Sequence, residues 1–239
     1  MGESEACFSA GLRPMTGPNP KGIRVLIAID GIYSVGKSTL IDGILPRLGA
    51  LTGRPVSMTD WNSSDLVGAH IPEWKRDGRL GPHSLLFAEA ADLAHRCETS
   101  LGADLDRGGV VLADRHVASG IARSVIRGVE PALASRVFDF APREALTILV
   151  ECPPAVTLER RKRLGKVLGG YHSGRDYRRT SDVEADFLRY QGEMQLLYRS
   201  WAAARGRVLT VDTDRRSAEE CVQAALDAIA ELSARESVL

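Results

Sequence analysis

The chain has few residues of the kinds that build disulfide frameworks, metal centres or membrane spans. Its four cysteines do not have CxxC spacing, and its five histidines show no metal-ligand spacing. No apolar run reaches the length of a membrane-spanning helix or of a signal-peptide core. We therefore expect free thiols, no membrane partner and a cytoplasmic protein.

The charge balance excludes another class of partner. Lysine and arginine together number 31, as do aspartate and glutamate, so the formal net charge is zero. No global field would then draw the chain onto nucleic acid. A hydrophobic content of 44% and a charged content of 26% are typical of an ordinary globular protein. We expect residues 1–22 to form a flexible tail and residues 23–239 to form a single domain.

Short β-rich segments alternate with longer helical patterns along the chain. The candidate strands are residues 24–30, 56–59, 110–113, 146–150 and 208–211. This alternation predicts an α/β fold in which helices cover a parallel sheet. Ligands of open α/β sheets bind outside the carboxyl ends of the strands. We therefore expect the acidic residues at those ends to come near one site: Asp60, Asp114, Glu151 and Asp212.

The strongest motif is Gly31-x-x-x-x-Gly36-Lys37-Ser38, between a predicted strand and a helix that begins at Lys37. The glycines let the loop turn its backbone N–H groups inward, the lysine reaches the terminal phosphates, and the serine ligates magnesium. The positive N-terminal end of the helix adds to this attraction. The motif predicts a nucleotide-binding loop formed by Gly31, Ser34, Val35, Gly36, Lys37, Ser38 and Thr39.

Asp114 and Arg115 directly follow the predicted strand at residues 110–113. A carboxylate at this place can hold a magnesium-bound water, and the arginine can grip a phosphate oxygen or the acceptor. The alternative is an aspartate that caps the next helix beside a surface arginine. The nearby phosphate loop favours the functional interpretation.

A third cluster is strongly basic and glycine-rich, and it predicts a mobile lid at about residues 160–180. Arginines on a closing segment can stabilise the charge that spreads over a migrating phosphoryl group. The glycines would provide its hinges. A basic helix is more often simply a solvated face. We nevertheless expect one or two of its arginines to be catalytic, with Arg160, Arg161, Arg163 and Arg175 as candidates.

The segment after the lid predicts a long core-facing helix. Ser181 and Glu184 have the spacing of a capping box, and large apolar side chains recur every three or four residues from Phe187 to Trp201. We expect the aromatic residues of this helix to pack in the core and to take no part in chemistry.

In this order, the motifs resemble the thymidylate kinase-like branch of phosphate-loop nucleoside and nucleotide kinases. The similarity runs from about Arg24 to Arg216, through the loop, the LLFAEAADLAH helix, the DRH triplet, the LERRKR lid start and the helix after the lid. It implies a three-layer P-loop kinase fold with a five-stranded parallel sheet and a mobile lid. It also implies ATP and Mg²⁺ as cofactors, with Ser38 and Asp114 at the metal. Related enzymes are often dimers, which makes residues 82–97 a candidate homodimer interface.

The sequence departs from that family on the acceptor side. The family's helix arginine that holds the acceptor's monophosphate is replaced by Ala91 or Leu93, depending on the alignment. Tyr33 and Ser34 stand where the family's loop has an acidic residue and a glycine. The donor half therefore matches the family better than the acceptor half.

These departures point to a hydroxyl acceptor, which needs a base that removes its proton and no cationic clamp. Asp60 followed by Trp61 resembles the layout of deoxynucleoside kinases, and we take Asp60 as the candidate base. Its alternative is a residue of an Asx turn. Residues 60–98 contain seven acidic residues against four lysines and arginines, a balance that would repel a phosphate and attract an amine. The candidate acceptor-binding residues are Trp61, Glu89, Asp92 and Arg115.

The leading hypothesis is an ATP-dependent kinase that phosphorylates a hydroxyl of a small molecule, either a nucleoside or an aminoglycoside-type aminosugar. Its candidate catalytic residues are Asp60, Lys37, Arg115, Arg160 and Arg163. One alternative is a thymidylate kinase in which Arg96, Arg115 or Arg123 replaces the missing clamp. Another is a regulator that binds nucleotide but has lost catalysis.

Overall fold

A single parallel sheet forms the centre of the described structure, a computed structural model that covers residues 24–204 and 206–236. Its strand order is β2-β3-β1-β4-β5. The strands are β1 (Val25–Gly31), β2 (Val56–Asp60), β3 (Val110–Asp114), β4 (Leu146–Glu151) and β5 (Val208–Asp212). The predicted five-stranded α/β sheet is confirmed, and each strand ends one residue later than expected. The tail predicted at residues 1–22 lies outside the described residues.

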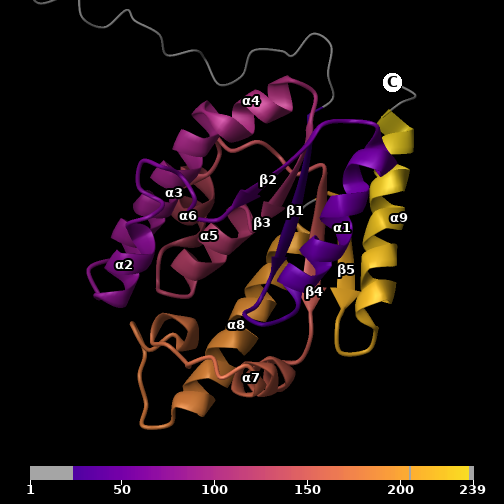
Figure 1. Ribbon diagram of the computed structural model, residues 1–239. Coiled ribbons are helices and arrows are strands. Elements are labelled where there is room, and N and C mark those ends of the chain that lie inside the picture. Colours follow the sequence, from indigo (N-terminus) through magenta and orange to yellow (C-terminus); the bar gives the residue numbers. More distant parts are fainter. Residues whose placement is uncertain (1–23, 205, 237–239) are drawn as a thin grey trace, which may run out of the picture.

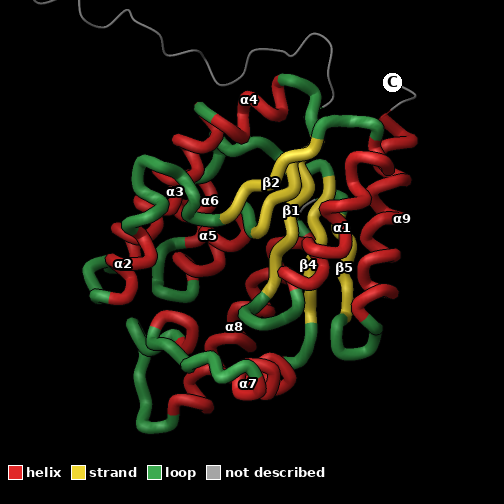
Figure 2. The backbone as a smooth tube through the Cα atoms, in the orientation of Figure 1, coloured by secondary structure: helices red, strands yellow, loops and turns green. Residues whose placement is uncertain are grey.

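Helices cover both faces of the sheet and give the three layers of the P-loop kinase fold (Figures 1 and 2). On one face lie α1 (Lys37–Thr52) and α9 (Ala218–Glu236), and on the other lie α4 (Ser100–Asp106), α5 (Val117–Val125) and α8 (Val183–Ala203). The remaining helices are α2 (Ile71–Arg76), α3 (Pro82–Glu98), α6 (Pro131–Val137), α7 (Pro154–Arg163) and the 3-10 helix η1 (Tyr171–Ser173). None of the helices in this part of the chain is long and apolar enough to cross a bilayer.

The core explains why β1 reads as a continuous apolar segment. Both faces of the sheet are covered, so every residue of β1 is buried. Ile27 and Ile29 belong to a large apolar cluster with α1 and α9, whereas Leu26 belongs to a second cluster with α3 and α5. The strand is therefore held rigidly, and it fixes the position of the loop that follows it.

The strand order places the carboxyl end of β1 at a switch in chain direction. After β1 the chain adds β2 and β3 on one side, and then β4 and β5 on the other. Ligands of open α/β sheets bind at such a point. The strand-end acids share this edge, because Asp60 pairs with Asp114 and Glu151 pairs with Asp212 in the strand register.

The lid segment, residues 160–180, lies beyond the carboxyl ends of the strands and beside α8 (Figure 1). It contains the end of α7, the helix η1 and the loop that leads into α8. The capping box predicted at Ser181 is wrong. The N-cap of α8 is Asp182, whose carboxylate accepts hydrogen bonds from the backbone N–H groups of Glu184 and Ala185, so the next residue does the capping.

Candidate functional site

The phosphate loop joins β1 to α1 and has the backbone that its glycines allow. Gly31 and Gly36 have φ angles of 152° and 108°, and a Cβ atom on Gly31 would lie 2.3 Å from the carbonyl oxygen of Val150. Only glycine fits there without displacing β4. Gly36 is the N-cap of α1 and makes no side-chain capping bond. The first N–H groups of α1 therefore suit an anionic ligand.

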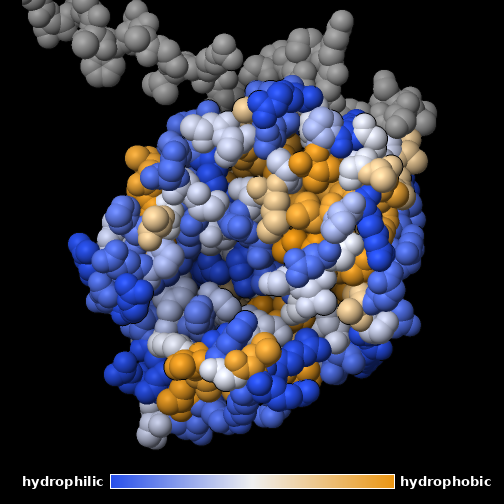
Figure 3. Space-filling view, in the orientation of Figure 1, coloured by the Kyte–Doolittle hydropathy of each residue, from blue (hydrophilic) through white to orange (hydrophobic). Residues whose placement is uncertain are grey.

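A cavity of about 780 Å³ opens beside this loop. Figure 3 shows a hydrophilic hollow near the centre of this face of the molecule, above the lid segment. Seven cationic side chains line the cavity: Lys37, Arg115, Arg160, Arg161, Arg163, Lys166 and Arg216. No carboxylate occurs among the described residues that line it. Such a cavity suits a polyphosphate.

Lys37 and Asp114 meet at the end of the loop, with Nζ and Oδ1 3.9 Å apart. Burial and the guanidinium of Arg115 lower the pKa of Lys37 to about 7, against the opposing effect of Asp114. Asp114 Oδ1 is buried and accepts no hydrogen bond. A carboxylate oxygen without a donor, together with the Ser38 hydroxyl at the start of α1, forms a donor set that fits Mg²⁺.

Arg115 is held behind the loop by three acceptors. Its Nη1 donates to the carbonyl oxygen of Gly31 at 2.8 Å, to Ser119 Oγ at 3.0 Å and to the Tyr198 hydroxyl at 2.9 Å. Its backbone is left-handed, with a φ of 73°. Tyr198 lies on α8, whose aromatic residues were expected only to pack. Tyr198 packs in the core as expected, and its hydroxyl also accepts a hydrogen bond from Arg115, a contact that only the folded structure reveals.

The lid arginines divide by their partners. Arg160 donates to the carbonyl oxygens of Val35 and Thr213, and so it ties α7 to the loop. Arg161 donates to the carbonyl oxygen of Val167 at 2.6 Å and lies 3.4 Å from Ser34 Oγ. Arg163 is exposed at the cavity wall. These three arginines line the cavity.

Arg175, the fourth candidate, pairs with Asp186 at 2.6 Å and is not among the lining residues. Its guanidinium also donates to the carbonyl oxygen of Thr180 at 2.9 Å. Arg175 therefore joins the lid segment to the first turn of α8 and does not line the cavity beside the phosphate loop.

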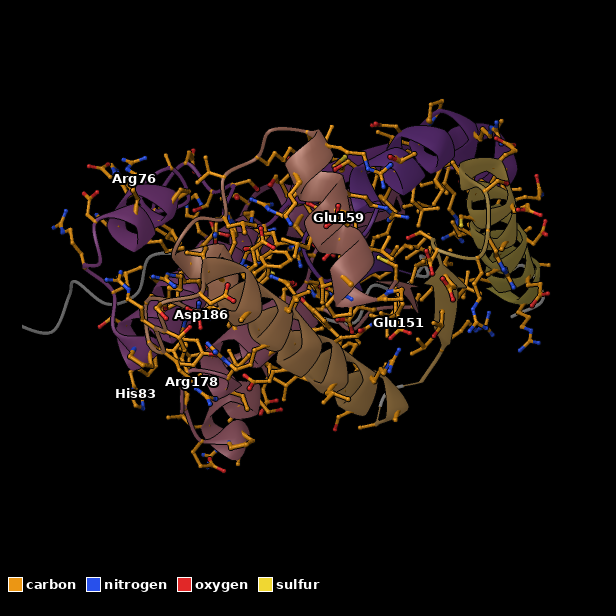
Figure 4. The ribbon with its side chains drawn as sticks, turned by 90° about the horizontal axis from the view of Figure 1, so that it is seen from below. Arg76, His83, Glu151, Glu159, Arg178 and Asp186 are labelled. Atoms are coloured by element: carbon orange, nitrogen blue, oxygen red, sulfur yellow. The ribbon has the colours of Figure 1, made fainter. Side chains whose placement is uncertain are left out.

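Two of the four strand-end acids do not share the site. Glu151 accepts two hydrogen bonds from Arg199, at 2.7 and 2.9 Å, and Figure 4 shows it near the far end of α8. Asp212 accepts hydrogen bonds from the backbone N–H groups that follow it. Both lie on the β4 and β5 side of the loop, where these partners occupy them. The expectation that all four acids meet is therefore wrong.

Asp60 lies beside Asp114 at the end of β2, and its side chain is exposed. Partial desolvation at the end of the strand and the neighbouring Asp114 raise the pKa of the Asp60 carboxyl, while Arg96 lowers it. The N–H of Trp61 donates to the carbonyl oxygen of Asp114, which is the last bond between β2 and β3, and a turn follows at Trp61 and Asn62. Trp61 then packs against Phe138 and Arg96.

The two buried acids that were candidate acceptor-binding residues, Glu89 and Asp92, are both paired with cations. Glu89 is fully buried, and its Oε1 accepts from Lys75 Nζ at 2.6 Å and lies 3.4 Å from Arg123 Nη1. Asp92 is also buried and accepts from Arg96 Nε at 3.0 Å. Each of these carboxylates is neutralised by a cation. These two acids therefore contribute no unpaired negative charge that could repel a phosphate.

The pKa of Tyr33 depends on the charged side chains that surround its hydroxyl. Burial alone would raise the pKa of Tyr33, but Arg123 and Arg115 outweigh that effect and lower it. Its hydroxyl accepts from Arg123 Nη2 at 3.4 Å, and its ring packs at 4.0 Å against His172 of the lid segment. Three cationic side chains, Lys75, Arg115 and Arg123, therefore lie near Tyr33, together with the one buried carboxylate of Glu89.

Comparisons with known proteins agree with this geometry. A family model described as thymidylate kinase matches residues 29–225. A probable thymidylate kinase 2 of Saccharolobus solfataricus is 29% identical over 191 residues, which cover 80% of this chain and 89% of that protein. A thymidylate kinase of Leifsonia xyli subsp. xyli is 30% identical over 197 residues, with coverages of 80% and 88%. The chain therefore belongs to the thymidylate kinase family of ATP-dependent phosphate-loop kinases.

Proposed function

We propose that this kinase transfers the γ-phosphoryl group of ATP to the phosphate of a nucleoside monophosphate, with thymidylate as the first candidate. The relatives bear the name thymidylate kinase, which supports the alternative hypothesis better than the hydroxyl-acceptor hypothesis. The observation that carries the proposal is the charge of the acceptor side.

Cations exceed carboxylates on the acceptor side. Lys75, Arg115 and Arg123 surround Tyr33, and Glu89 is the buried carboxylate that faces two of them. The lowered pKa of Tyr33 supports a net positive field in spite of burial. A monophosphate dianion is complementary to such a field, whereas a cationic aminosugar is not. Arg123, already one of the three candidates for the missing clamp, is the best placed of them beside Lys75.

The reaction would use the residues of the loop and the lid in distinct roles. Backbone N–H groups of the loop and Lys37 would hold the triphosphate. Ser38 and Asp114 would hold Mg²⁺, whose charge neutralises the phosphate oxygens during transfer. Arg115 would contact the transferred group, and Arg161 and Arg163 would cover it from the lid segment. An ionised monophosphate oxygen needs no general base.

One observation supports a hydroxyl acceptor as the second candidate function. Asp60 lies beside Asp114 with a raised pKa, which is the position and basicity of a residue that could remove a proton. Its exposed side chain and the paired state of Glu89 and Asp92 weigh against an aminosugar at the same place.

An acceptor panel tests the proposal. Purified protein with ATP and Mg²⁺ is given thymidylate, other pyrimidine and purine monophosphates, thymidine and a set of aminoglycosides, and ADP formation and the phosphorylated product are measured. We expect turnover of at least one monophosphate, with thymidylate first. Turnover of thymidine or an aminoglycoside without turnover of any monophosphate would overturn the proposal. ATP binding without turnover of any acceptor would favour the regulator.

A further inference from the structure

A chain of hydrogen bonds runs from Arg115 to a buried carboxylate behind the phosphate loop. Arg115 Nη1 donates to the Tyr198 hydroxyl at 2.9 Å, and that hydroxyl lies 2.8 Å from Ser119 Oγ. Ser119 Oγ donates to Asp30 Oδ1 at 2.6 Å. Ser119 and Asp30 are fully buried and Tyr198 is 1% exposed. The four residues come from β1, α5, α8 and the end of β3, so only the fold brings them together.

The donor and acceptor capacities of these groups fix the direction of every hydrogen bond in this network. A guanidinium only donates, so the hydroxyls of Tyr198 and Ser119 must both accept from Arg115. Ser119 gives its single proton to Asp30, and Tyr198 is then left to give its proton to Ser119. Asp30 Oδ1 accepts at the end of the chain whether or not the other oxygen carries a proton. The hydroxyl protons of Tyr198 and Ser119 are therefore both used in hydrogen bonds within this network.

This anchoring leaves one side of the guanidinium free for a ligand. Every hydrogen bond that the Arg115 side chain makes within the described residues uses Nη1. Nε and Nη2 remain as donors, and Arg115 lines the cavity beside Lys37. The left-handed backbone of Arg115, a conformation that non-glycine residues rarely adopt, is held by its N–H bond to the carbonyl oxygen of Ile29.

The same helix that supplies Tyr198 also contacts the loop directly. Gln191 Oε1 accepts from the backbone N–H of Tyr33 at 3.0 Å, and its Nε2 donates to the carbonyl oxygen of His172. Gln195 donates to the carbonyl oxygen of Cys152 at the end of β4. Gln191 therefore fixes helix α8 to both the loop and the lid segment, and Tyr198 fixes it to Arg115.

We propose that Asp30, Ser119 and Tyr198 are positioning residues that orient the guanidinium of Arg115 for phosphoryl transfer. This inference rests on the role of Arg115 in the proposed function. Removal of one hydroxyl lets the guanidinium rotate away from the transferred group while ATP is still held by the loop. The chemical step should slow more than nucleotide binding weakens.

The test compares Ser119→Ala and Tyr198→Phe with Ser124→Ala. Ser124 lies on the same helix as Ser119, is also fully buried, and has a hydroxyl without a hydrogen-bond partner, so it is a matched control. We expect each test variant to lose about 10-fold to 100-fold in kcat for thymidylate with the KM for ATP nearly unchanged. Ser124→Ala should retain the wild-type kcat. A wild-type kcat in both test variants would overturn the inference.

A double-mutant cycle separates positioning from general loss of stability. In an Arg115→Ala background, Ser119→Ala should cause no further loss of kcat, because the group that it orients is gone. An equal loss in both backgrounds would show a structural effect and would overturn the inference. Acceptor-free ATP hydrolysis, measured in the same variants, distinguishes this failure from failure of the proposed acceptor. Should thymidylate not be turned over, that hydrolysis must still show the same coupling.

Discussion

Asp60 and Asp114 are register partners at the carboxyl ends of β2 and β3, and only Asp114 contacts Lys37. The Asp114 carboxylate has a buried oxygen beside the phosphate loop, whereas the Asp60 side chain is exposed. Two acids that neighbour each other in the sheet therefore have different environments. The buried oxygen of Asp114 suits the proposed role at Mg²⁺, and the exposed Asp60 is the candidate for a general base.

Substitution of the two acids should give opposite results. Asp114→Asn removes the charge next to Lys37 and the proposed Mg²⁺ site, and kcat should fall by roughly 100-fold or more. Asp60→Asn should leave kcat for thymidylate within about threefold of wild type, because an ionised monophosphate needs no base. Steady-state assays at saturating ATP and Mg²⁺ measure both. A large loss of kcat in Asp60→Asn would favour the hydroxyl acceptor instead.

Lys75 should act on the acceptor and not on the nucleotide. In Lys75→Met, Glu89 keeps Arg123 as a cationic partner, so the fold is retained. We expect the KM for thymidylate to rise roughly 10-fold, the effect of one charge-assisted contact, while the KM for ATP stays unchanged. Lys162→Met is the matched control, since Lys162 pairs with Glu184 on the exposed face of the lid segment. An unchanged KM for thymidylate would remove Lys75 from the acceptor site.

His172 should make the packing of the lid segment sensitive to acid. His172 packs on Tyr33. Burial is the main cause that lowers the pKa of His172 to about 3, and the positive charge of Arg161 is the second. An unpacked histidine has a pKa of about 6.5. The packed lid is therefore fully stable above about pH 6.5, and it loses stability progressively as the pH falls from there towards the packed-state pKa.

Limited proteolysis of the lid segment between about pH 8 and about pH 5 measures this effect. We expect cleavage of the wild type to increase towards the acidic end. His172→Phe keeps an aromatic ring against Tyr33 but cannot titrate, so its cleavage should show a smaller pH dependence. His83→Asn, at the exposed start of α3, is the control and should behave like the wild type. Equal pH dependence in His172→Phe would contradict the prediction.

Asp186 should stabilise the junction between the lid segment and α8, where Figure 4 places it. Its carboxylate accepts from the N–H of Thr180 at 2.9 Å and from Arg189 at 2.8 Å. These contacts hold the pKa of Asp186 well below its ordinary value. We expect Asp186→Asn to lower Tm by about 2–6 °C at neutral pH.

The pH dependence of this loss has a definite sign. A carboxylate with a depressed native pKa stabilises the fold above the unfolded pKa, about 3.9, and loses that effect as the pH falls through the native value. The Tm difference between Asp186→Asn and wild type should therefore shrink in acid. Asp42→Asn on the exposed side of α1 should show no such difference. A Tm difference that grows on acidification would contradict this account.

Phe87 should report on self-association. It lies on α3, the helix of the predicted homodimer contact, with 54% of its surface exposed. If α3 forms the contact, Phe87→Glu should convert a dimer to a monomer in light scattering after size-exclusion chromatography. A Leu196→Glu variant, exposed on α8, is the control and should remain a dimer. A wild-type monomer at micromolar concentration would refute the contact.

Local pattern was enough to place the donor half. The apolar segment of β1, the glycines of the loop and Lys37 lie within a few residues of one another, and their backbone geometry depends on that local sequence. The five strands were predicted for the same reason, because alternating β-rich and helical segments specify a parallel sheet. The predicted carboxyl end of each strand was one residue too early, because pairing with a neighbouring strand extends the observed strand by that residue.

The contacts of the candidate acceptor-binding residues could not be predicted from local sequence in the same way. Glu89 pairs with Lys75, 14 residues earlier, and with Arg123, 34 residues later. A count of acidic residues between positions 60 and 98 includes Glu89 but misses Arg123. Tyr198 likewise reaches Arg115 across 83 positions. Neither contact leaves a periodic signal in the sequence.

The sequence by itself determined the sheet, the phosphate loop and membership of the kinase family, because strand, turn and helix signals arise between near neighbours. The tertiary structure decided which charged groups surround Tyr33 and how Arg115 is anchored. A side chain's effective charge depends on which groups lie within a few ångströms of it in a buried environment, and only the folded chain sets those distances.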